Sequence, residues 1–167
     1  MDAAVSAARE KLNQPTPLKR DCGRICGARC CRPLEGEETG MLLFPGEADA
    51  YDGKAGWQTR QTAQGILLVC PGSCRREERP LSCRLFPLLP LIGDGGEIRV
   101  VTDLRAQAVC PLARQGKNAM DPAFIDAVRE AGKILAEEDE QAVFLAMLAE
   151  EQAELKRLRD RFSVHGL

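Results

Sequence analysis

The feature that most constrains this chain is a run of four cysteines within ten residues, Cys22, Cys26, Cys30 and Cys31. A cysteine that only packs in a core needs no neighbour of its own kind, so packing does not explain such a run. Four more cysteines follow, each beside a turn-forming or charged residue: Cys70, Cys74, Cys83 and Cys110. Deprotonated cysteine is the soft ligand that zinc and iron–sulfur clusters prefer. The pattern therefore predicts that all eight cysteines are thiolate ligands of metal.

The spacing of the cysteines limits how they can share a metal. Cys22, Cys26 and Cys30 are spaced by four residues, which would place them in one stripe on a helix or around one cluster on a wrapped loop. Cys30 and Cys31 are neighbours, and neighbouring side chains are expected to diverge. This favours two sites, or one site and a spare thiol, over one crowded site. We therefore predict a site, or a pair of neighbouring sites, that connects residues 22–31 with residues 70–110. The alternative is a self-contained loop site made by the first three cysteines, with the later ones simply buried.

Other uses of these cysteines fit the sequence less well. The gaps between them lie within the range of zinc modules but match no standard zinc finger or ribbon. A radical S-adenosylmethionine cluster needs Cys-x3-Cys-x2-Cys, and Cys30 misses the second gap by one residue. A cysteine nucleophile would lack a histidine base, because the only histidine, His165, lies almost at the C-terminus.

Charge and hydropathy limit the partners and the compartment. The net charge is −2 and the pI is about 5.6, which argues against a nucleic-acid partner. Residues 2–14 carry charges where a signal peptide would be apolar, and the longest apolar stretch, residues 85–92, contains two prolines. We therefore expect neither export nor a membrane span. The expected location is the cytoplasm, where thiols stay reduced; four disulfides would be the alternative in an exported chain.

The apolar patterns predict an α+β fold. We expect a small, irregular, metal-nucleated domain over residues 1–120, with a short β-hairpin or small antiparallel sheet, and a C-terminal helical hairpin over residues 121–167 that packs on it. Aromatic residues make up only 4% of the chain, so bound metal should supply part of the stability. The expected elements are a helix over 2–13, loop with at most a turn or two of helix over 22–31, an acidic turn over 36–40, a short apolar segment over 41–44, a helical turn over 45–51, a strand over 65–69, a hairpin over 88–102, and helices from Asp121 and from near Asp139. Residues 52–64 and 70–83 are expected to be irregular.

Three motifs together carry a family resemblance. They are Cys22-x3-Cys26-x3-Cys30-Cys31-Arg32, Cys70-Pro-Gly-Ser-Cys74 and Arg79-Pro80-x2-Cys83-Arg84-x-Phe86-Pro87. Over residues 20–112 the chain resembles the bacterial CxxCxxCC-type cysteine-cluster family, which is described as a zinc- or iron-chelating domain. The first cysteine gaps are wider here than in the short signature of that family. The resemblance implies metal binding, without a settled reaction for the family as a whole. Some larger relatives are linked to lysine N-methylation of flagellin, and no methylase residue is recognised in this chain.

The arginines near the cysteines suit the charge of such a site. Four thiolates leave a divalent zinc, or a cluster core of the same charge, with a net charge near −2, which nearby guanidinium groups would offset. Arg79 and Arg84 lie within the family motif, and we predict that both contact the cofactor.

Three functions stay open at this point. The leading interpretation is a cytoplasmic protein that binds iron, as an iron–sulfur cluster, or zinc. One alternative is a metal- or cluster-dependent enzyme, acting on a protein side chain as the flagellin methylases do or on a small molecule, for which a vacant coordination position would be the mark. The other is an adaptor that docks a protein partner through the C-terminal helices.

Overall fold

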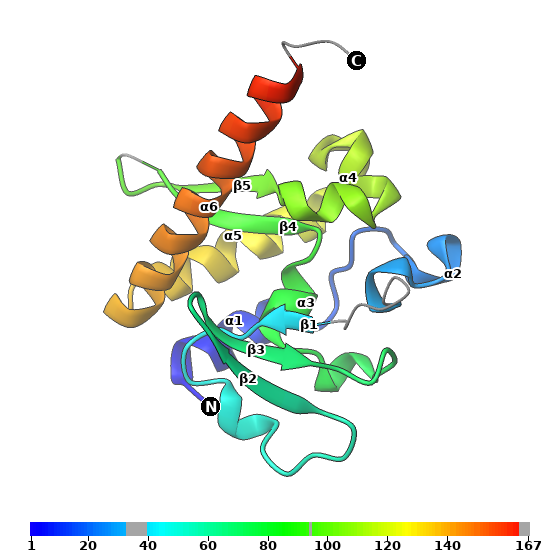
Figure 1. Ribbon diagram of the computed structural model, residues 1–167, viewed down its shortest axis with the longest axis vertical. Helices are drawn as coiled ribbons and strands as arrows, with labels where there is room; N and C mark the ends of the chain where they lie inside the picture. Colours follow the sequence, from blue (N-terminus) through cyan, green and yellow to red (C-terminus); the bar gives the residue numbers. More distant parts are fainter. Residues whose placement is uncertain (33–39, 94, 164–167) are drawn as a thin grey trace.

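The fold consists of two small antiparallel sheets with helices around them, which confirms the expected α+β class (Figure 1). The computed structural model describes residues 1–32, 40–93 and 95–163. Most of the expected acidic turn, residues 36–39, and the histidine at position 165 therefore lie outside the described residues. Within the described residues, no helix is both long enough and apolar enough to cross a membrane.

The first sheet has the strand order β1-β3-β2, with β1 at Gly40–Leu42, β2 at Gln58–Thr62 and β3 at Gly65–Val69. Strands β2 and β3 form a hairpin, in which Thr62 pairs with Gly65. The expectation that residues 52–64 are irregular is wrong over β2. This strand is polar and mostly exposed, so it lacks the apolar alternation that marks a strand in a sequence. Pairing with the apolar strand β3 holds it at the edge of the sheet instead.

The second sheet is the expected hairpin. Strand β4 runs over Leu88–Ile92 and β5 over Ile98–Thr102, and Ile92 pairs with Ile98. Its inner residues join the main core, where Leu88 is fully buried and Val100 nearly so.

Three longer helices complete that core: α1 at Ala3–Lys11, α5 at Pro122–Ala136 and α6 at Asp139–Ser163. Asp2 caps α1 and Asp121 caps α5, each accepting a backbone N–H with its side chain. The helices bury apolar residues at helical spacing, among them Val5, Ala8, Leu12, Phe124, Val128, Leu135, Phe144, Leu145 and Leu148. The core therefore takes side chains from both sides of residue 120.

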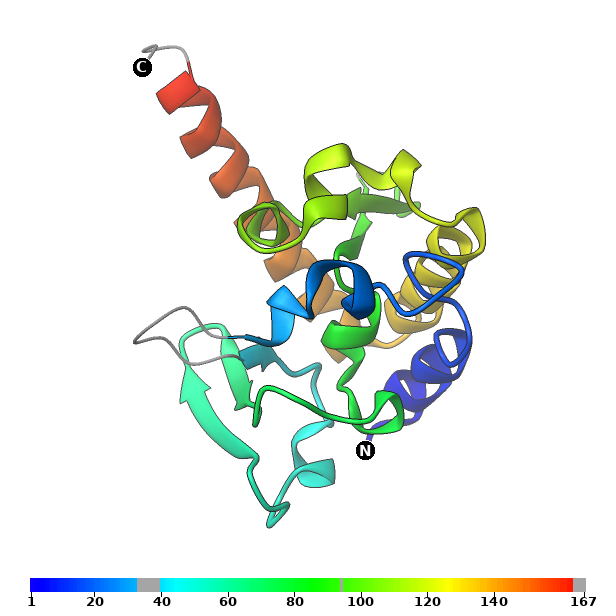
Figure 2. The ribbon, with the colours of Figure 1, turned by 90° about the vertical axis from the view of Figure 1, so that its right-hand side faces the viewer.

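Helix α5 packs tightly on the β4–β5 hairpin. A Cβ atom added at Gly132 would lie 2.5 Å from Cβ of Pro90 and 2.8 Å from Cγ2 of Ile98. Helix α6 instead leaves the core along its second half, which projects beyond the rest of the molecule in Figures 1 and 2. Leu158 is 42% exposed there and Phe162 is 75% exposed.

Short helical segments connect these elements and carry four of the eight cysteines; η marks a 3-10 helix. They are α2 at Gly23–Cys26, η1 at Arg29–Cys31, η2 at Ala48–Ala50, η3 at Arg76–Glu78, α3 at Leu81–Leu85, η4 at Leu104–Ala108, α4 at Pro111–Gln115 and η5 at Lys117–Ala119. The helical turn expected over 45–51 is only the three-residue η2. The irregular segment expected over 70–83 ends instead in helix α3, which carries Cys83.

Candidate metal centre

The first four cysteines lie in a stretch that folds back on itself. Cys26 ends the one-turn helix α2, after which Gly27 and Ala28 adopt left-handed conformations with φ of 64° and 53°. The amide of Ala28 donates to the carbonyl of Gly23 at 2.8 Å, and this closes the reversal. The left-handed conformation costs an L-residue about 1–2 kcal/mol, so the reversal at Ala28 is held against a local preference. The expected loop with a turn of helix is confirmed.

Cys30 and Cys31 lie next to each other on η1, and their Sγ atoms are 3.9 Å apart. The expectation that these side chains diverge is wrong, because their two sulfurs lie close together on this turn. The hydrogen bond from Cys30 lowers the pKa of Cys31 to about 6, and the charge of Arg79 acts in the same direction against burial. Cys31 is therefore the thiol of this pair that ionises first.

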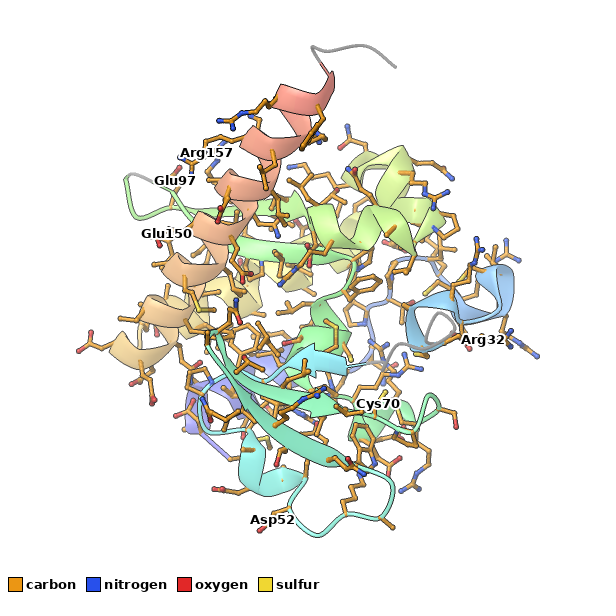
Figure 3. All side chains as sticks on the ribbon, in the orientation of Figure 1. Arg32, Asp52, Cys70, Glu97, Glu150 and Arg157 are labelled. Atoms are coloured by element: carbon orange, nitrogen blue, oxygen red, sulfur yellow. The ribbon has the colours of Figure 1, made fainter. Side chains whose placement is uncertain are left out.

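Cys83 lies within electrostatic range of three other cysteines. It lies on α3, where burial raises the pKa of its thiol, and the charges of Cys31, Cys70 and Cys74 raise that pKa further. Cys74 in turn lies within electrostatic range of Cys31 and Cys70, and burial raises its pKa as well. Figure 3 shows Cys70 at the end of β3, on the side of the molecule that also carries Arg32.

Cys22 connects the remaining segment to the cluster. Burial raises the pKa of its thiol, and the neighbouring charges of Cys26, Asp21 and Cys110 add to the effect. Cys110 comes from far along the chain, at the N-terminus of α4. Figure 2 turns toward the viewer the side of the molecule on which α2 and η1 lie. The fold thus brings residues 22–31 within electrostatic range of residues 70–110.

Arg79 is the cation placed among these thiols. Its charge acts on Cys74, Cys31 and Cys83, and also on Cys22. Its Nε atom is buried and has no hydrogen-bond partner within the described residues. A buried donor without an acceptor is costly, and a thiolate or sulfide sulfur is an acceptor that would suit it. The residues present therefore fit an anionic metal–thiolate group beside Arg79.

Arg84 occupies a different environment from Arg79. Its guanidinium donates to the carbonyls of Arg79, Arg9 and Glu77, and to Oδ1 of Asn13 at 2.6 Å. These bonds connect α1 with the segment before α3, which makes Arg84 part of the scaffold under the site. That it contacts a cofactor stays a prediction.

Glu47 supports the site, and its role could not be read from the sequence. Its carboxylate is fully buried and accepts the backbone N–H of Leu81 at 2.9 Å, where α3 begins, two residues before Cys83. The same carboxylate accepts from Phe44 at 3.2 Å and pairs with Arg9 at 2.9 Å. Burial raises the pKa of Glu47, and these hydrogen bonds oppose the rise. The only sequence signal is an acidic residue after Pro-Gly, which equally suits an exposed turn.

A cavity of about 360 Å³ opens beside the thiols, and five cysteines line it together with Arg79: Cys30, Cys31, Cys70, Cys74 and Cys83. Its other walls are mainly apolar and reach the core at Phe44, Phe144 and Leu148. Asp103 and Arg105 also line it, but they pair with each other at 3.0 Å. The free polar chemistry of the cavity therefore lies at its cysteine end.

The structure defines an α+β protein whose eight free thiols come from distant segments, and each thiol lies within electrostatic range of at least one other. Across residues 1–32, 40–93 and 95–163, no three cysteine, histidine or carboxylate side chains are already spaced closely enough to hold a metal ion. None of the protein families, curated proteins or solved structures compared with this chain matches it.

Proposed function

We propose that the protein binds metal through its cysteine thiolates, as zinc or as an iron–sulfur cluster. The observation that carries this proposal is the position of Arg79, whose buried Nε has no acceptor within the described residues and whose charge acts on Cys22, Cys31, Cys74 and Cys83. Thiolates bind these metals best, and a cation nearby offsets their charge. The resemblance to the CxxCxxCC-type family supports the same function.

We also propose that the protein works in the cytoplasm, where its thiols stay reduced. The supporting observation is that all eight cysteines are free. Alkylation of denatured, non-reduced protein from cells, followed by mass spectrometry, should then label the thiols. Four intact disulfides in that protein would contradict the proposal.

Purification without oxygen, followed by measurement of iron, sulfide and zinc per chain, tests the metal itself. We expect bound metal in the protein as isolated, and less of it in the variant Cys83→Ser. Ser73→Ala is the matched control. Ser73 is exposed and lies between Cys70 and Cys74, but its side chain has no thiol to bind metal. A protein isolated without metal that also takes up none on reconstitution would contradict the proposal.

The cavity favours one second candidate, an enzyme that uses the metal or cluster. A space of about 360 Å³ with mainly apolar walls has the size and chemistry of a small-molecule site. Its thiol end would place a bound molecule against the metal. A vacant coordination position, seen as an exogenous ligand bound to the metal, would support catalysis, whereas closed four-thiolate coordination would support structure or storage.

A further inference from the structure

The eight cysteines divide into two sets of three, with the Cys30–Cys31 pair between them. We infer that the chain holds two neighbouring metal centres: one made by Cys22, Cys26, Cys30 and Cys110, the other by Cys31, Cys70, Cys74 and Cys83. This inference rests on the proposed function and assigns each cysteine to a centre.

The second centre is defined by Cys83. Three thiols from two other segments lie within its electrostatic range, namely Cys31 on η1, and Cys70 and Cys74 after β3. All four line the same cavity. Two of these cysteines are held by regular structure. Cys83 lies on α3, whose first residue is hydrogen-bonded to Glu47, and Cys31 lies on η1. This centre therefore faces the cavity.

The first centre is defined by Cys22. Cys22 and Cys26 lie at the two ends of the one-turn helix α2, where Sγ of Cys26 is 3.6 Å from the carbonyl oxygen of Cys22. Cys110 lies within electrostatic range of Cys22, and Cys30 within range of both Cys22 and Cys26. The backbone amide of Cys110 donates to the carbonyl of Ala106 at 2.7 Å, which fixes this cysteine at the start of α4. Of these four, only Cys30 lines the described walls of the cavity. This centre therefore lies beside the cavity rather than in it.

Adjacent cysteines at the join explain how one short turn serves both centres. Cys30 lies within electrostatic range of Cys22 and Cys26, while Cys31 lies within range of Cys74 and Cys83. Arg79 acts on Cys22 in one set and on Cys31, Cys74 and Cys83 in the other, so one cation would offset charge on both centres.

Two sulfurs bound to one tetrahedral zinc are about 3.8 Å apart, which follows from a zinc–sulfur distance of about 2.3 Å. The separation of 3.9 Å between the pair therefore also suits a single shared metal, and the experiment must separate the two arrangements.

Cadmium is a suitable probe, because it binds thiolates and gives one nuclear resonance for each site. Protein stripped of metal under reducing, anaerobic conditions is titrated with ¹¹³Cd²⁺, and the bound cadmium is counted. We expect two equivalents per chain and two resonances typical of sulfur ligands. Cys110→Ser should remove or shift one resonance, and Cys83→Ser the other, each variant losing about half of the tightly bound cadmium.

Far-UV circular dichroism checks that each variant is folded, and the reciprocal pattern is the decisive result, since general misfolding would affect both resonances alike. If a variant does not fold, Cys74→Ser replaces Cys83→Ser and Cys26→Ser replaces Cys110→Ser, with the same expected pattern. One equivalent and one resonance, or a folded single variant that loses all cadmium, would overturn the two-centre arrangement and leave metal binding standing. Protein that takes up no cadmium would overturn both.

Discussion

Glu47 offers the sharpest test of how the scaffold holds the site. Replacing it in Glu47→Ala would remove three acceptor contacts from a fully buried position: to Arg9, to the amide of Phe44 and to the amide of Leu81. An unsatisfied buried N–H costs about 1–3 kcal/mol, and breaking a buried ion pair costs about 3–5 kcal/mol. These costs are not additive, because Arg9 keeps its bonds to Tyr51 and to the carbonyl of Glu77.

We therefore expect Glu47→Ala to lower the free energy of unfolding by about 4 kcal/mol, a large share of the about 5–15 kcal/mol of a typical domain. Urea unfolding of the metal-loaded protein measures this, with far-UV dichroism and the fluorescence of Trp57 as probes. The only tryptophan is a local reporter, since its ring lies 5.1 Å from that of Tyr51. Glu150→Ala is the control. Glu150 is an exposed residue of α6, labelled in Figure 3, and its replacement should change the free energy of unfolding by less than about 0.5 kcal/mol. A loss below about 1 kcal/mol in Glu47→Ala would refute the reasoning.

The pKa of Glu47 adds a dependence on pH to this test. Burial raises that pKa above the carboxyl's ordinary 4.5, so the folded protein holds the proton more tightly than the unfolded chain does. The contribution of this group is therefore fully present below pH 4.5 and is lost as the pH rises through the folded-state pKa. Glu47→Gln cannot titrate, so its free energy of unfolding should lack this decline. Identical pH profiles for the two proteins would contradict a raised pKa.

Four further variants or treatments test other parts of the structure. Gly132→Ala should lower the melting temperature although alanine favours helix, because overpacking against Pro90 costs about 1–3 kcal/mol; exposed Lys133→Ala in the same helix should not. Tyr51→Phe should lower the free energy of unfolding in urea by about 1 kcal/mol, since the hydroxyl of Tyr51 donates to the carbonyl of Glu78 at 3.0 Å. An unchanged free energy of unfolding would show that this hydrogen bond does not stabilise the fold. In metal-free protein, iodoacetamide should label Cys31 at a rate that rises near pH 6, before the other thiols react; equal labelling of all thiols would contradict it. Removing metal by chelation should speed amide exchange over residues 22–32 and leave α5 protected, whereas full protection of both would contradict a role for metal in local order.

The core elements were predictable because their signals are local. The cap at Asp121, the apolar faces of α1 and α5, and the β4–β5 hairpin each follow from residues near one another in the sequence. Strand β2 was missed because its residues are polar, and only the neighbouring strand β3 makes it a strand. Tertiary pairing, rather than propensity, decides that segment.

The candidate site divides in the same way. Residue type and spacing marked all eight cysteines, because thiols at these spacings have few other uses, whereas the family resemblance marked Arg79 and Arg84. The geometry of Cys30 and Cys31 could not be predicted, because the side-chain directions depend on the left-handed residue Ala28 before the 3-10 turn. Glu47 was also out of reach, since its partners Arg9 and Leu81 are 38 and 34 residues away.

These observations separate what the scaffold orders from what metal would order. Helix α2 and turn η1 bury no side chain, so the hydrophobic effect contributes little to holding residues 23–31 in place. The main core, by contrast, is built by α1, α3, β4, β5, α5 and α6, and it holds Cys83 through α3 and Glu47. One half of the site is therefore fixed before any metal binds, and the other half is a short stretch with several ligands and few packing contacts. If the chain binds metal as proposed, the free energy of binding would go mainly into ordering residues 22–31 against a prepared surface, rather than into folding the whole chain.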